Sequence, residues 1–140
     1  MARILAIDFG EKRTGLAITD PLRIIANGLT TIETPKLKEF IKNYFAKEEV
    51  DLLVIGYPKT LKNELAKVTV QIDRFLEWFV AEFSQIKVVK IDERFTSKMA
   101  FQTMIESGIG KKARQNKALI DQISATIILQ SYIESQSCQN

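Results

Sequence analysis

The chain has 140 residues, of which 46% are hydrophobic and 26% charged, and its formal net charge is +3, as is typical of one soluble globular domain. Its longest apolar runs fall far short of the roughly 20 residues that cross a bilayer, and Ile4–Ile7 is too short for a signal-peptide core, so we expect a cytoplasmic protein. With no histidine and one cysteine, Cys138, the sequence excludes histidine catalysis, an internal disulfide and a cysteine-based zinc site.

The first part of the chain predicts three short strands. Residues 3–8 form an apolar run, residues 13–20 alternate between larger and smaller side chains, and residues 24–32 form a third strand weakened by Asn27-Gly28. Turn signals at Phe9–Lys12 and Asp20-Pro21 separate them. Such short connections favour an antiparallel meander.

The remainder alternates helices and strands. Helical spacing over 36–48 predicts a helix with Thr34 as its N-cap and Pro35 as its first residue. A strand at 51–55, a helix at 64–83, a strand at 86–91 and helices at 97–106 and 116–134 follow. Strand–helix alternation implies parallel strands. We therefore predict one α/β domain over residues 1–134, with a mixed five-stranded sheet and helices on both faces, and a polar C-terminal tail over 135–140.

Acidic residues follow two of the predicted strands. Asp8 precedes Phe9-Gly10, and Asp92-Glu93-Arg94 ends the last strand. Ligands of open sheets bind beyond the carboxyl ends of strands. Because strand side chains alternate between faces, only one of Asp92 and Glu93 can share a face with Asp8, unless the chain has already turned there. The structural alternatives are a turn aspartate that caps Gly10 and a solvated ion pair at the strand end.

The last helix carries a third acid, Asp121, among isoleucines. Lys117 lies four residues earlier, so a surface ion pair is the structural alternative for Asp121. A basic segment leads into this helix and comprises Lys111, Lys112, Arg114 and Lys117. Such a cluster either forms a solvated loop or binds backbone phosphates of a nucleic acid.

Converging carboxylates suggest a metal centre. Three acids at one point repel one another unless cations compensate. Two divalent ions about 4 Å apart, bridged by a carboxylate, serve phosphodiester hydrolysis without any histidine. Oxygen ligands suit Mg²⁺ or Mn²⁺. The residues therefore predict a metal-dependent nuclease, a hydrolase acting on ester bonds.

Four motifs in order carry a family resemblance. They are Asp8-Phe9-Gly10 with Arg13, Gly15 and Ala17; Gly56-Tyr57-Pro58; Asp92-Glu93-Arg94-Phe95-Thr96-Ser97; and Lys117 with Asp121, Ser124-Ala125 and Ile128-Leu129. Over essentially its whole length the sequence resembles the YqgF family, which is described as pre-16S rRNA nucleases and, from fold analogy, as Holliday junction resolvases. It departs from the family at residues 59–64, where a polar, glycine-containing loop is usual.

The resemblance implies a ribonuclease H-like fold with Asp8, Glu93 and Asp121 as catalytic, metal-binding acids, and it selects Glu93 over Asp92. Arg13 and Arg94 are then phosphate-facing or site-ordering groups, and the basic segment binds nucleic acid. The favoured substrate is the 5′ end of pre-16S rRNA, with the small-subunit precursor as partner, and the enzyme acts as a monomer or weak homodimer. The alternatives are a dimeric DNA junction resolvase and a non-catalytic nucleic-acid-binding module. An actin-like phosphotransferase, suggested by the D-x-G turn, needs two domains.

Overall fold

The computed structural model describes residues 2–57, 63–92 and 117–138, with the backbone alone at 63–66, 92, 117–118 and 137–138. Five strands form one sheet in the order β3-β2-β1-β4-β5. They are β1 (Arg3–Asp8), β2 (Arg13–Thr19), β3 (Ala26–Glu33), β4 (Val50–Tyr57) and β5 (Lys87–Asp92). The pairs β1–β2 and β2–β3 are antiparallel, whereas β1–β4 and β4–β5 are parallel. The predicted mixed sheet is confirmed.

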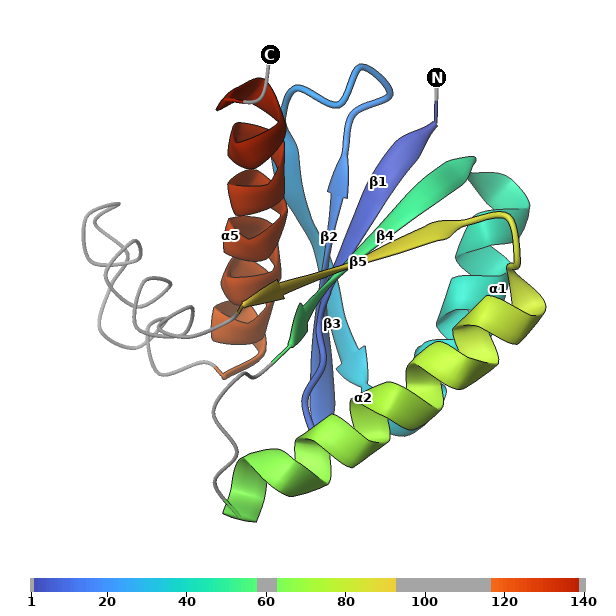
Figure 1. Ribbon diagram of the computed structural model, residues 1–140, viewed down its shortest axis with the longest axis vertical. Helices are drawn as coiled ribbons and strands as arrows, with labels where there is room; N and C mark the ends of the chain where they lie inside the picture. The colour runs from blue at the N-terminus through green and yellow to red at the C-terminus, as the bar shows by residue number, and fades with distance from the viewer. Residues whose placement is uncertain (1, 58–62, 93–116, 139–140) are drawn as a thin grey trace.

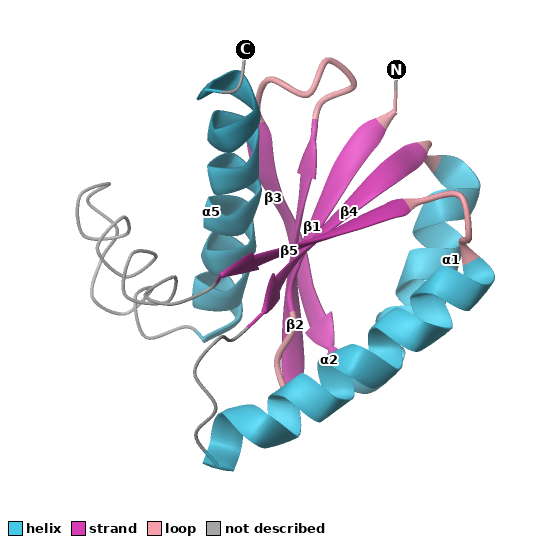
Figure 2. Ribbon diagram, in the orientation of Figure 1, coloured by secondary structure: helices cyan, strands magenta, loops and turns pink. Residues whose placement is uncertain are grey.

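In the described part of the chain, three α-helices cover the two faces of this sheet (Figures 1 and 2). α1 (Leu37–Lys47) and α2 (Asn63–Glu82) lie on one face, and α5 (Lys117–Cys138) lies on the other. None of the described helices is long and apolar enough to cross a membrane.

Strand alternation divides the core between these faces. On β1, Leu5 and Ile7 belong to the cluster that includes α1 and α2, whereas Ile4 and Ala6 pack with Ala125, Ile128 and Leu129 of α5. The α1–α2 layer is rich in aromatic rings, with Phe79 fully buried among its neighbours. The α5 layer uses smaller side chains such as Ala6 and Ala17, which lets the helix approach the sheet closely.

Several predicted boundaries were wrong. Thr34 does not cap the helix over 36–48: a short 3₁₀ helix, η1 (Thr34–Lys36), precedes α1, and neither has a side-chain cap hydrogen bond. The third strand starts at Ala26 rather than Ile24. The last helix continues beyond Glu134 to Cys138, because no glycine or proline stops it in that polar stretch. The helix predicted at 97–106 lies outside the described residues.

Candidate active site

Asp8 ends β1 on the face that α5 covers. Even-numbered positions of β1 face α5, since Ile4 and Ala6 belong to that layer, and Asp8 continues the series as a half-buried residue. On β2 the residue directly opposite is Gly15. Antiparallel partners lie about 4.5–5.5 Å apart between Cα atoms, so the backbone of Gly15 is the immediate neighbour of Asp8.

Asp121 reaches the same place from the first turns of α5. Its Oδ2 accepts a hydrogen bond from Arg13 Nε at 3.1 Å, although the two residues are 108 positions apart. The Asp121 and Arg13 side chains are 25% and 37% exposed. The ion pair therefore joins α5 to the start of β2 at the edge of the interior. The side chain of Lys117, the partner considered from the sequence, is not described.

Gly15 brings the two acids together. A Cβ at Gly15 would lie 2.0 Å from the backbone oxygen of Asp121, closer than any real contact. The absence of a side chain at Gly15 thus lets the Asp121 turn of α5 sit on the strand that pairs with Asp8. Glycine inside a strand often marks such a close approach, and this signal in the sequence could have located the contact.

The turn between β1 and β2 is held in a fixed shape. A Cβ at Gly10 would lie 2.2 Å from the Arg13 backbone oxygen, so this position also requires glycine. Thr34 Oγ1 donates to the Gly10 carbonyl oxygen at 2.7 Å and lies 2.9 Å from Thr14 Oγ1. The Thr34 amide donates to the Lys12 carbonyl oxygen at 3.0 Å. Thr34, read from the sequence as a helix cap, instead fixes the turn that presents Asp8 and Arg13.

Ser124 adds a further polar group to this face of α5. It is 1% exposed, and its Oγ has no hydrogen-bond partner within the described part of the chain. It lies three residues after Asp121, so both residues lie on neighbouring turns of one helix face. A buried hydroxyl without a partner is uncommon and is a feature that can be explained by a bound group.

The structure describes only some of the remaining predicted site residues. Glu93, Arg94, Lys111, Lys112 and Arg114 lie outside the described residues, and Lys117 is placed by its backbone as the first residue of α5. Asp92 ends β5 beside Tyr57 of β4. Within residues 2–57, 63–92 and 117–138, no group of three or more metal-ligating side chains occurs. The structure thus brings together Asp8, Asp121 and Arg13, while the triad with Glu93 stays a prediction.

Tyr57 carries an interaction that the sequence did not indicate. Its hydroxyl donates to Asp73 Oδ1 of α2 at 3.1 Å, and Lys90 Nζ of β5 lies 4.5 Å from its ring centroid. Partial burial, followed by the hydrogen bond to the Asp73 carboxylate and its negative charge, raises the pKa of Tyr57 above its ordinary value. These contacts join β4, β5 and α2 at the end of the sheet where Asp8 lies.

Comparison with known proteins identifies the class first. The structure resembles that of T. thermophilus RuvC in complex with a Holliday junction substrate, with a TM-score of 0.63 at 15% sequence identity, over 98% of this chain and 96% of that one. At this identity the likeness shows the fold alone, and it confirms the ribonuclease H-like α/β architecture.

The sequence then gives the family. A family model described as RuvX, Holliday junction resolvase, matches residues 2–135, and the chain belongs to this family. A relative from Flavobacterium johnsoniae, named "Putative pre-16S rRNA nuclease", is 55% identical over 97% of this chain and 99% of its own length. One from Bacteroides thetaiotaomicron with the same name is 52% identical over 97% and 99%. The predicted membership of a nuclease family, whose chemistry is ester-bond hydrolysis, is confirmed.

Proposed function

We propose that this protein is a metal-dependent nuclease that hydrolyses phosphodiester bonds in structured RNA, at the 5′ end of pre-16S rRNA in the cytoplasm. The observation that carries the proposal is the convergence of Asp8 and Asp121 across Gly15. Family membership supports the nuclease chemistry, and the name shared by the relatives supports the RNA substrate.

The donor atoms at this site suit Mg²⁺ or Mn²⁺. Carboxylate oxygens from Asp8 and Asp121 are hard ligands, and the sequence contains no histidine to favour a softer metal. Asp8, Asp121 and Glu93 would hold the ions, which supply an activated water and stabilise the leaving oxygen when bound. The assignment of Glu93 rests on the family motif and on β5, whose odd-numbered positions Val89 and Ile91 face the α5 layer.

The residues of this chain have distinct tasks in the proposal. Arg13 is a positioning residue, because its Nε donates a hydrogen bond to Asp121 Oδ2 and so orients that carboxylate. Gly15 sets the spacing between strand and helix. Arg94, Lys111, Lys112, Arg114 and Lys117 would bind the phosphates that flank the cut, which fixes the strand relative to the acids.

A DNA junction resolvase is the second candidate. The description of the matched family model and the RuvC-like fold favour it. Because a junction resolvase cuts two opposed strands, it would act as a homodimer, whereas an RNA-processing enzyme can act as a monomer or weak homodimer on the small-subunit precursor. The two candidates share the same acids and differ in substrate and assembly.

A cleavage assay separates them. The full chain is incubated with a pre-16S rRNA 5′ leader and, in parallel, with a four-way DNA junction, each with Mg²⁺ or Mn²⁺. We expect the RNA to be cut and Asp8→Asn to abolish the cut. Cutting of the junction alone would replace the RNA proposal by the resolvase. Equal cleavage by Asp8→Asn and the parent would show that the acid assignment is wrong, and the absence of any cleavage would favour a non-catalytic binding module.

A further inference from the structure

A pocket lies on the other side of the turn that presents Asp8. It has a volume of about 350 Å³ and is lined by Phe9, Thr34 and residues of α1 and α2. Phe9 follows Asp8 directly and packs in the α1–α2 layer, so the pocket and the candidate active site lie on opposite faces at the same end of the sheet. The size falls at the lower end of the range for small-ligand pockets.

The inner wall of this pocket is apolar, apart from one amide oxygen that has no hydrogen-bond partner in the described part of the chain. Phe9 and Phe75 are 7% and 4% exposed, and their ring centroids are 5.8 Å apart. Gln71 also lines the pocket, and its Oε1 is buried with no hydrogen-bond partner among the described residues. Burying an amide oxygen unpaired is unfavourable. A ligand with a flat apolar body and an N–H group would match both features.

The rim of the pocket is mainly basic. Lys38 of α1 and Arg74 of α2 line it and are exposed, against one acid, Glu11 of the turn. Lys38 Nζ lies 5.4 Å from the ring centroid of Trp78, which holds the cation on the α1–α2 surface. The rim therefore favours an anionic group next to the flat body that the wall accepts.

We propose that this pocket binds one unpaired nucleobase of the RNA strand, whose backbone crosses the turn at Phe9–Lys12 toward Asp8. Proteins recognise RNA mostly through splayed-out bases that meet apolar or aromatic walls and hydrogen-bonding side chains. A rotation of the Gln71 side chain, which lines the pocket, brings the buried Oε1 to an N–H of the base, and Lys38 and Arg74 contact its phosphates. The inference rests on the proposed nuclease function for the identity of the strand, and it adds an anchoring site separate from the acids.

The test measures binding in EDTA, so that no metal-dependent cleavage contributes. The probes are a fluorescent RNA hairpin with a short single-stranded 5′ extension and the same hairpin with an abasic extension. The variants are Gln71→Met, which keeps the side-chain length but removes the amide, and Arg74→Gln. The matched control is Lys42→Gln, because Lys42 Nζ also lies near Trp78, at 5.9 Å, but does not line the pocket.

We expect the parent to bind the extended hairpin more tightly than the abasic one. Gln71→Met should weaken binding of the extended hairpin about three- to tenfold and leave the abasic one unchanged. Arg74→Gln should weaken both, and Lys42→Gln should resemble the parent. The melting temperature of Gln71→Met should stay level or rise, since an unpaired buried oxygen is removed, which a purely structural role for Gln71 would not give.

Two results would overturn the proposal: equal parental affinity for both hairpins, or unchanged binding of the extended hairpin by Gln71→Met. Neither depends on catalysis. If the parent never cuts RNA but discriminates the hairpins through Gln71, the nuclease proposal fails and the base pocket stands. If the parent cuts RNA but binds the two hairpins equally, the nuclease proposal stands and the base-pocket proposal fails.

Discussion

The two ends of the sheet use the same residue types in different arrangements. At the amino end of β1, Arg3 Nε pairs with Glu48 Oε2 at 3.2 Å, Arg23 pairs with Asp51, and Asp20 accepts the amides of Ile24 and Ile25. Each of these acids ties down a loop or a strand start. At the carboxyl end, Asp8 and Asp121 come from a strand end and a helix that Gly15 allows to meet. The glycine contact, more than the acids, distinguishes the end of the sheet at which we propose the active site.

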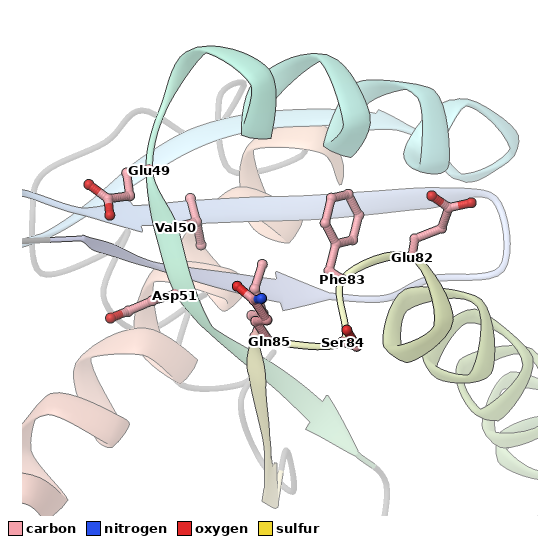
Figure 3. A pocket seen from close by; sticks show the side chains of 8 residues that line it. Glu49, Val50, Asp51, Glu82, Phe83, Ser84 and Gln85 are labelled. Atoms are coloured by element: carbon pink, nitrogen blue, oxygen red, sulfur yellow. The ribbon is translucent and has the colours of Figure 1, made fainter.

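A cavity at the amino end of the sheet also shows that acidic residues alone do not identify a site. It measures about 500 Å³ and is lined by three acids, Glu49, Asp51 and Glu82 (Figure 3). Figure 3 shows Glu82 on the opposite side of the cavity from Glu49 and Asp51. Within the described part of the chain, no three metal-ligating side chains lie close enough to share an ion. A count of acids around a hollow therefore does not identify a metal centre.

The largest contrast is expected between Asp8→Asn and Asp51→Asn. Asp8→Asn keeps the size of the side chain and removes the charge that would hold a divalent ion, so cleavage of the RNA leader should fall at least about a hundredfold. Asp51→Asn removes a charge at the other end and should leave the cleavage rate within about twofold, with a stability change of about 0–1 kcal/mol. Single-turnover rates and thermal melts measure both. Similar losses of cleavage rate in the two variants would contradict a functional difference between the two ends of the sheet.

Gly15→Ala tests the close approach of α5. The added methyl group meets backbone atoms of Asp121 and Gln122, which cannot rotate away. We expect a loss of about 1–3 kcal/mol in the free energy of unfolding and, because Asp121 moves relative to Asp8, a drop in rate of up to about a hundredfold. Chemical denaturation and cleavage assays give the two quantities.

Gly28→Ala is the matched control for that change. A Cβ at Gly28 would meet the side chain of Gln122, with Nε2 at 2.4 Å, and a flexible side chain can move. Its rate should stay near that of the parent. A rate loss as large as that of Gly15→Ala would mean that any perturbation under α5, rather than the Asp8–Asp121 spacing, governs activity.

Arg13→Gln and Arg23→Gln compare two arginines that pair with aspartates. Arg13 orients Asp121, and loss of a group that orients a metal ligand typically lowers activity about 10- to 100-fold, so we expect that range for kcat with little change in KM. Arg23 pairs with Asp51 and donates to the Ala2 carbonyl oxygen, so Arg23→Gln should lower only the melting temperature. Unchanged kcat in Arg13→Gln would refute its positioning role.

The smallest effect concerns pH and Asp20. The amide of Ile25, followed by other backbone amides, lowers the pKa of Asp20 below 3.8 in the folded state. Its contribution to stability is therefore present above pH 3.8 and is lost as the pH falls through the lowered pKa. Melting temperatures of the parent and Asp20→Asn should differ above that pH and converge below it. A constant difference across the acid range would contradict this assignment.

The sequence pattern predicted the sheet and the face on which Asp8 lies. It did not predict the contacts of Arg13 and Thr34 at the candidate site. Alternation along β1 and the short connections between the first strands determine the sheet and the face of Asp8. The Arg13–Asp121 ion pair spans 108 positions and leaves no periodic signal. Thr34 has the composition of a helix cap, yet the Gly10 carbonyl oxygen competes for its hydroxyl. At Asp121 and at Thr34, a tertiary contact decided the geometry that local rules missed.

Metal binding tests the central claim most directly. Calorimetric titration of Mn²⁺ into the full chain is compared for the parent, Asp8→Asn and Asp51→Asn. We predict that the parent and Asp51→Asn bind Mn²⁺ with equal affinity, and that Asp8→Asn binds it at least about tenfold more weakly. Equal Mn²⁺ affinity in Asp8→Asn and the parent, or no uptake by the parent, would contradict a metal centre at Asp8.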